Sequence, residues 1–335
     1  MPKVSVIIPN YNHAQFLEQR IESVLNQTFQ DFEIIFLDDA STDNSKEVFS
    51  KYSSHPKISH VIFNETNSGS PFKQWNKGFG LSTGEYIWIA ESDDYAEPTI
   101  LEKLVQKLDA HPRVGLAYSQ SWQVDKNGSI LSTMDWWTDD LDICKWKNDY
   151  IVSGADECAN YLVVKNTIPN ASAVIFRHCF ITELDSDIEK FKLCGDWLFW
   201  IKILLKCNIA FVAEPLNYFR THENTARKLI NLKVHVLEKF NILTYLSQSV
   251  KIPDKIIYNI QSELIDSYVN CWYSEPLEYH EFVNLYRKFI TINCKSSQFI
   301  NIQINFFKKM LVIFRLKLAL GTKIKKILGF KLDTK

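Results

Sequence analysis

The feature that most constrains the fold is an alternation, over the first third of the chain, of short apolar runs with helical patterns. The runs are rich in Val, Ile and Phe, as expected for parallel strands buried on both faces. They cover residues 4–8, 33–37, 58–63 and 86–89, and helical patterns stand at about 16–25, 45–52, 72–81 and 98–108. Strands that alternate with helices predict βαβ units and a doubly wound, mostly parallel α/β sheet.

The pattern changes further along the chain. Residues 173–176 and 209–212 are predicted to be strands on either side of a helix at about 196–206, and residues 120–150 are predicted to be irregular. From about residue 226 the sequence shows only long helical patterns. We therefore predict a first domain over 1–225 and a helical C-terminal region over 226–335.

Composition excludes several classes of protein. The chain has 335 residues, 46% of them hydrophobic, and a formal net charge of -1. A nearly neutral balance argues against nucleic acid as a partner, because binding it requires a basic excess. The 7 cysteines include no Cys-x-x-Cys pair, so neither a disulfide framework nor a zinc site is indicated. Without a signal sequence or a long apolar run, we expect a cytoplasmic protein.

Acidic residues follow two of the predicted strands. Residues 38–43 read Asp-Asp-Ala-Ser-Thr-Asp, and residues 91–94 read Glu-Ser-Asp-Asp. Ligands of doubly wound sheets bind beyond the carboxyl ends of the strands, where both groups are expected. Two carboxylates about 4 Å apart repel by roughly 4 kcal/mol near a protein surface, so residues 91–94 predict a bound cation.

Other interpretations of these segments are weaker. Residues 39–50 begin like a calcium loop, but Asn44 replaces the glycine and Ser50 the final glutamate that such a loop needs. A turn followed by a helix N-cap remains an open interpretation of residues 38–43. The glycine-rich loop of dehydrogenases and the P-loop lysine do not follow the first strand, where Pro-Asn-Tyr-Asn stands at 9–12.

Together, five segments in this order and spacing resemble glycosyltransferase family 2. They are VSVIIPNYN at 4–12, LNQTF at 25–29, LDDASTD at 37–43, GEYI at 84–87 and ESDD at 91–94. The resemblance extends over roughly residues 3–225. It implies an inverting glycosyltransferase with the nucleotide-diphospho-sugar transferase (GT-A) fold.

The resemblance also implies roles for individual residues. Pro9, Tyr11 and Asp39 match positions that hold the nucleobase, and Asp38 would support that loop or reach the ribose. Glu91, Ser92 and Asp93 match an Asp-x-Asp signature that binds the ribose and a divalent metal, Mn²⁺ or Mg²⁺. The metal ligands are predicted to be Asp93, Asp94 and His222, although His222 could also be structural. Asp196 matches the catalytic base, whereas the residues alone favour a helix N-cap at this position.

The chain departs from the family pattern at two positions. Glu91 stands where aspartate is usual, and Trp75 where many relatives carry an arginine that faces the phosphates. Lys73, one turn earlier on the predicted helix, is the replacement we predict for that charge.

The predicted function is transfer of a sugar from a nucleotide-sugar, UDP-linked by preference, to a hydroxyl of a glycan or lipid-linked saccharide in cell-surface polysaccharide synthesis. The alternatives are a catalytically inactive nucleotide-sugar or glycan-binding module and, less favoured, a nucleotidyltransferase. Residues 302–330 combine apolar and basic residues, a pattern typical of helices on anionic membrane surfaces, and predict contact with the inner face of the cell membrane. Packing of this helix on the catalytic domain remains the other interpretation.

Overall fold

The computed structural model describes residues 1–183, 186–222, 232–260 and 263. The chain divides into two compact units, Met1–Val234 and His235–Lys335. The predicted membrane-contact segment at 302–330 lies outside the described residues. Within the described part, no helix has the length and apolar character needed to cross a membrane.

The described residues of the first unit form a mixed sheet of 10 strands. Its order is β3-β2-β1-β4-β9-β6-β10-β5, with β7 on β6 and β8 on β10. The strands are β1 (Val4–Asn10), β2 (Phe32–Asp38), β3 (Ile58–Phe63), β4 (Tyr86–Ile89), β5 (Tyr95–Ala96), β6 (Val114–Val124), β7 (Ile130–Thr133), β8 (Tyr150–Ser153), β9 (Val174–Arg177) and β10 (Asn208–Arg220). Strands β3, β2, β1 and β4 are parallel, as predicted for βαβ units. Strand β9 is antiparallel to both β4 and β6, while β10 runs parallel to β6. The predicted α/β fold is confirmed.

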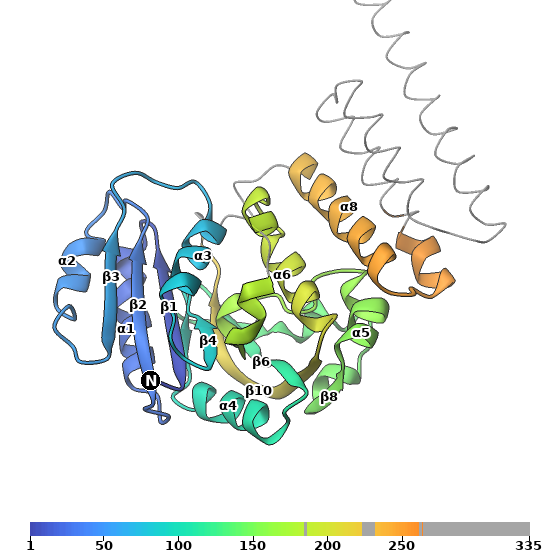
Figure 1. Cartoon of the computed structure of the whole chain (residues 1–335), viewed down its shortest axis with the longest axis horizontal. Coiled ribbons are helices and arrows are strands. Elements are labelled where there is room, and N and C mark those ends of the chain that lie inside the picture. Colours follow the sequence, from blue (N-terminus) through green and yellow to red (C-terminus); the bar gives the residue numbers. More distant parts are fainter. Residues whose placement is uncertain (184–185, 223–231, 261–262, 264–335) are drawn as a thin grey trace, which may run out of the picture. The chain divides into compact units, whose positions relative to one another are not determined.

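Helices cover both faces of this sheet (Figure 1). The described α-helices of the unit are α1 (Ala14–Leu25), α2 (Ser45–Ser50), α3 (Pro71–Leu81), α4 (Ile100–Ala110), α5 (Gly154–Glu157) and α6 (Gly195–Leu204), and α8 (Leu232–Ser249) follows. Buried side chains of α1, α2 and α4 share one core cluster with β1, β2 and β4. On the opposite face, α3 and α6 meet through Phe79 and Phe199, whose rings stack with centroids 5.5 Å apart.

The continuous apolar character of the strands follows from this two-sided packing. Val4, Val6 and Ile8 of β1 point into the cluster with α1, since alternate residues of a strand share a face. Ile7 points the other way, toward α3, which comes so close that a Cβ on Gly78 would lie 2.6 Å from Ile7 Cγ2. Only glycine at position 78 permits this approach of helix and strand.

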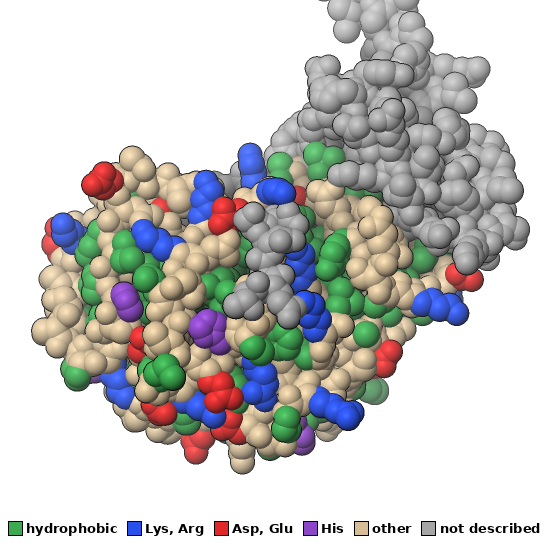
Figure 2. Space-filling model, in the orientation of Figure 1, with side chains coloured by type: hydrophobic (Ala, Val, Ile, Leu, Met, Phe, Trp, Pro, Cys, Tyr) green, Lys and Arg blue, Asp and Glu red, His purple; other side chains and the backbone are tan. Residues whose placement is uncertain are grey.

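The prediction that residues 120–150 are irregular is wrong in part. Strand β6 continues to Val124, and β7 pairs with it over Ile130–Thr133. The polar run Ser119-Gln120-Ser121 hid this strand from the apolar pattern, although all three side chains are buried. On the described part of the face shown in Figure 2, acidic and basic side chains are interspersed.

Candidate metal and nucleotide site

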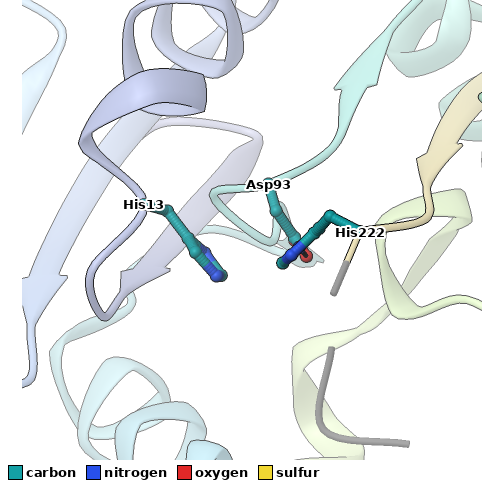
Figure 3. A group of neighbouring side chains, drawn as sticks. All are labelled: His13, Asp93 and His222. Atoms are coloured by element: carbon teal, nitrogen blue, oxygen red, sulfur yellow. Dashed lines mark hydrogen bonds and ion pairs between the residues drawn. The ribbon is translucent and has the colours of Figure 1, made fainter. Parts of the chain in front are cut away.

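Three side chains from separate loops meet at the carboxyl ends of β1, β4 and β10. His13, Asp93 and His222 each offer one metal-binding atom, and these atoms all lie within 4.8 Å of one another. Figure 3 shows the three side chains pointing toward one another. His222 Nε2 lies 3.0 Å from Asp93 Oδ2. One carboxylate oxygen and two imidazole nitrogens form a donor set that suits a divalent first-row ion better than Mg²⁺, which favours oxygen.

The pKa shifts of His13 and Asp93 favour the protonation states that bind metals. Burial lowers the pKa of His13, which favours the neutral imidazole. Burial would by itself raise the pKa of Asp93, but the hydrogen bond with His222 opposes this effect, and the pKa of Asp93 is lowered. Neutral imidazole and ionised carboxylate are the forms that can donate an electron pair to a cation.

His13 was missed in the sequence. It directly follows the Pro9–Asn12 segment and therefore lies at the end of β1, as ligands of such sheets do. Its Nδ1 is 2.9 Å from Ser92 Oγ, which fixes the ring next to Asp93. The only sequence signal for His13 as a metal ligand was its position directly after a predicted strand. Residues 13, 93 and 222 are too far apart in the sequence to form a metal-binding motif.

Asp94 does not join the metal-binding group. It is 2% exposed and its Oδ1 accepts a hydrogen bond of 2.9 Å from the Arg220 backbone N–H. The Arg220 side chain donates to the carbonyl of Asp93 at 2.7 Å, to that of Lys126 at 2.9 Å and to Gln19 Oε1 at 2.6 Å. Arg220 and Asp94 therefore hold the loop of Asp93 against the end of β10, which brings His222 to Asp93.

The two departures from the family pattern are partners in the structure. Trp75 Nε1 donates a hydrogen bond of 2.8 Å to Glu91 Oε1, and Trp75 is 2% exposed. The side chain of Glu91, longer than the usual aspartate, therefore reaches the indole of Trp75, which stands at the position where many relatives carry arginine. Burial and the nearby Asp93 charge raise the pKa of Glu91 to about 8.

This pairing predicts a coupled effect on stability. In Glu91→Asp the shorter side chain would leave the Trp75 indole N–H buried without its acceptor, which costs about 1–3 kcal/mol of unfolding free energy. In the Trp75→Phe background, Glu91→Asp should lower the unfolding free energy by less, because phenylalanine has no N–H that needs an acceptor. Urea unfolding of wild type, both single variants and the double variant measures this coupling; additive losses would contradict the pairing.

Asp39 is engaged by neighbouring loops. It is 5% exposed, and its Oδ1 accepts from Asn64 Nδ2 and Gln74 Nε2, each at 2.7 Å. Ser68 donates to Oδ2 through its hydroxyl at 2.7 Å and also through its backbone N–H at 3.1 Å. Since a carboxylate has about four acceptor sites, these bonds occupy it. A nucleobase would have to displace one of them to reach Asp39.

Asp38 links the loops after β1 and β2. Its Oδ2 accepts from Asn10 Nδ2 at 2.7 Å, and its Oδ1 accepts from the Ser41 backbone N–H at 2.8 Å. Asn12 and Ala40 in these loops have left-handed φ angles of 57° and 60°. For residues other than glycine such angles are strained and often occur at functional sites.

The remaining predicted nucleotide-binding residues differ in exposure. Tyr11 is 46% exposed, whereas Pro9 and Ser92 are buried. Lys73 is exposed on α3, and its Nζ donates to the Ser68 carbonyl at 3.1 Å. Tyr11 thus offers an accessible ring, and Lys73 lies next to the loop that Asp39 holds.

Asp196 lies in the first turn of α6 rather than at its N-cap, which is Cys194. Its Oδ1 accepts from the Trp197 backbone N–H at 2.7 Å, and its Oδ2 accepts from Asn166 Nδ2 at 3.1 Å. It is partly exposed.

Comparison with known proteins identifies the family. Residues 5–152 match the model of glycosyl transferase family 2. An uncharacterized glycosyltransferase of Haemophilus influenzae is 27% identical over 77% of this chain and 79% of its own length. The chain carries a glycosyltransferase family 2 domain. The matched residues include the predicted nucleotide-binding segments, and the prediction of this family is confirmed.

Other relatives of the family 2 domain match over shorter stretches. Glycosyltransferase GlyG of Streptococcus pneumoniae is 37% identical over 35% of this chain and 39% of its own length. The match thus covers well under half the length of that relative.

Solved structures share the fold at low sequence identity. The S. aureus TarS structure in complex with UDP has a TM-score of 0.63, with 20% identity over 87% of this chain and 80% of that chain. The mannosyltransferase PcManGT from Pyrobaculum calidifontis, in complex with GDP-Man and Mn²⁺, has a TM-score of 0.52, with 14% identity over 92% of this chain and 86% of that chain.

Proposed function

We propose that this protein is a metal-dependent, inverting glycosyltransferase that uses a UDP-linked sugar and transfers it to a hydroxyl of a glycan or lipid-linked saccharide. The observation that carries the proposal is the convergence of His13, Asp93 and His222 within 4.8 Å at the strand ends of a family 2 domain. Such a site suits a sugar nucleotide, because a divalent ion held there could bind the diphosphate group of the donor. The solved structures with UDP, UDP-GlcNAc, or GDP-Man and Mn²⁺ support this donor class.

The residues have distinct tasks in this proposal. Tyr11 would stack on the nucleobase, since its exposed ring lies at the end of β1. Asp39 would hold the Ser68 loop that covers the nucleotide, and Lys73 would add positive charge beside it. Asp93, with His13 and His222, would hold Mn²⁺ in preference to Mg²⁺, because two of its three donors are imidazole nitrogens. The chemistry that such an ion supplies is neutralisation of the charge that develops on the leaving diphosphate.

Asp196 would be the general base of a single displacement. The acceptor hydroxyl gives its proton to the carboxylate as its oxygen attacks the anomeric carbon. The bond between that carbon and the diphosphate breaks, and its electron pair leaves with the nucleoside diphosphate. The sugar configuration inverts because attack and departure occur on opposite faces. The amide of Asn166 and the N–H of Trp197 keep the carboxylate in place during this transfer.

Chelation tests the metal requirement directly. The purified chain is incubated with UDP-, GDP- and dTDP-linked sugars, and release of nucleoside diphosphate is measured with Mn²⁺, with Mg²⁺ and after EDTA treatment. We expect release from a UDP-sugar that falls at least about 10-fold in EDTA and returns with Mn²⁺ more fully than with Mg²⁺. An unchanged rate in EDTA would contradict metal dependence, and nucleotide binding without release from any donor would favour the inactive binding module.

A further inference from the structure

One arginine of α1 occupies a position in the hydrophobic core. Arg20 lies on the same face of the helix as Phe16 and Val24, and all three side chains are buried. Arg20 is 0% exposed. Because an arginine is rarely buried to this extent unless a partner compensates its charge, its surroundings indicate what it does.

Arg20 contacts the loop that carries Asp93. Its Nε donates a hydrogen bond of 2.8 Å to the backbone carbonyl of Glu91. Its guanidinium carbon lies 5.7 Å from the centroid of the Trp88 ring, on the strand that leads into this loop. The chain that leads to the metal-binding group is thus held by Arg20 at both Trp88 and Glu91.

The charge of Arg20 acts on the same loop. Burial lowers the pKa of Arg20 to about 10, and the carboxylates of Asp94, Asp93 and Glu91 oppose this effect. The guanidinium therefore keeps its positive charge at neutral pH. In this way Arg20 supplies a buried positive charge to a loop that contains three acidic side chains.

The two terminal nitrogens of Arg20 are a further unusual feature. Both are buried, and neither has a hydrogen-bond partner among the described residues. Arg220 differs, since its side chain donates to the Asp93 carbonyl and to Gln19 Oε1. Ordered water commonly satisfies buried donors that no protein acceptor reaches. The terminal nitrogens of Arg20 are therefore suited to bind water inside the loop.

We propose that Arg20 is a positioning residue of the metal centre: its buried charge, with ordered water on its terminal nitrogens, holds Asp93 in place to bind the ion. The inference rests on the proposed metal-binding role of Asp93. Removal of one partner from a buried group of opposite charges strongly destabilises the charges that remain. Without Arg20 the acidic side chains of the loop would turn toward solvent and move Asp93 away from His13 and His222.

The test compares metal binding by variants that remove or keep this charge. Mn²⁺ is titrated into the full chain with and without UDP, and free Mn²⁺ is followed by EPR. We expect the neutral variants Arg20→Met and Arg20→Gln to bind Mn²⁺ roughly 10- to 100-fold more weakly, the usual effect of losing a residue that supports a metal ligand. Arg20→Lys keeps the charge and should lose less. Arg177→Met is the control, since Arg177 also donates to backbone carbonyls but lies at the other end of β4, opposite Tyr86.

A spectrum separates positioning from a general effect of charge or stability. Co²⁺ in place of Mn²⁺ gives visible absorption bands that depend on the ligands and their geometry. We expect these bands to change in the neutral variants and to stay as in wild type in Arg177→Met. In a folded neutral variant, Mn²⁺ binding as tight as in wild type or tighter, or weaker binding with unchanged Co²⁺ bands, overturns the role of Arg20. No Mn²⁺ binding by wild type in either condition would instead contradict the metal centre itself, and this inference with it.

Discussion

Replacement of Asp196 by Asn should slow sugar transfer by roughly 100- to 10,000-fold, the usual contribution of a general base. The amide has nearly the shape of the carboxylate but cannot take the proton of the acceptor hydroxyl. Since Asp196 lies on α6 and the metal-binding group lies at the ends of β1, β4 and β10, nucleotide affinity should remain within about a factor of two of wild type.

The experiment compares turnover and nucleotide binding in the same preparation. Release of nucleoside diphosphate gives kcat, and calorimetric titration with UDP and Mn²⁺ gives the dissociation constant. Transfer in Asp196→Asn at more than about a tenth of the wild-type rate would show that another group takes the proton. Loss of UDP binding together with activity would show that the variant damages the fold rather than the chemistry.

The sequence was sufficient to predict the half of the sheet that is built from βαβ units. Strands β1 to β4 are continuous apolar runs because helices cover both of their faces, and that pattern is visible without a structure. Strand β6 was not predicted, and its buried serine and glutamine side chains break the apolar pattern. The antiparallel insertion of β9 between β4 and β6 is a long-range pairing that local periodicity does not determine.

The site was predictable as a place and only partly as a set of contacts. Residues that follow strands were expected to converge, and Asp93 and His222 do so. The carboxylates of Asp93 and Asp94 are adjacent in sequence but have different partners. The Asp94 carboxylate is buried, where it accepts a hydrogen bond from the Arg220 backbone N–H. Which of two neighbouring side chains faces a site depends on the turn and on distant partners, so the spacing of residues 91–94 could not decide it.

Contacts between distant residues account for the other differences. His13 completes the group only because β1 and β4 are neighbours in the sheet and β10 ends nearby. The bond from Trp75 to Glu91 turns two separate departures from the family pattern into one interaction. Asp39 holds a loop through Asn64, Ser68 and Gln74, which come from 25 to 35 residues away.

The second large effect concerns Asp93. Its carboxylate is the anionic donor in the group with His13 and His222. Loss of a residue that only contacts a metal ligand usually weakens metal binding by roughly 10- to 100-fold. Asp93→Ala removes a ligand itself and should therefore weaken metal-dependent nucleotide binding by more than this. His13→Ala should weaken it in the same direction. Asp94→Asn should keep it, because the amide oxygen can still accept from the Arg220 N–H.

The most direct test of metal-dependent nucleotide binding is calorimetric titration of the full chain with UDP, with and without Mn²⁺, on wild type, Asp93→Ala, His13→Ala and Asp94→Asn. We expect wild type and Asp94→Asn to bind UDP only when Mn²⁺ is present. In Asp93→Ala and His13→Ala, UDP binding should be lost or strongly weakened. UDP binding that is equally tight without Mn²⁺, or that survives in Asp93→Ala, would contradict the proposed metal centre.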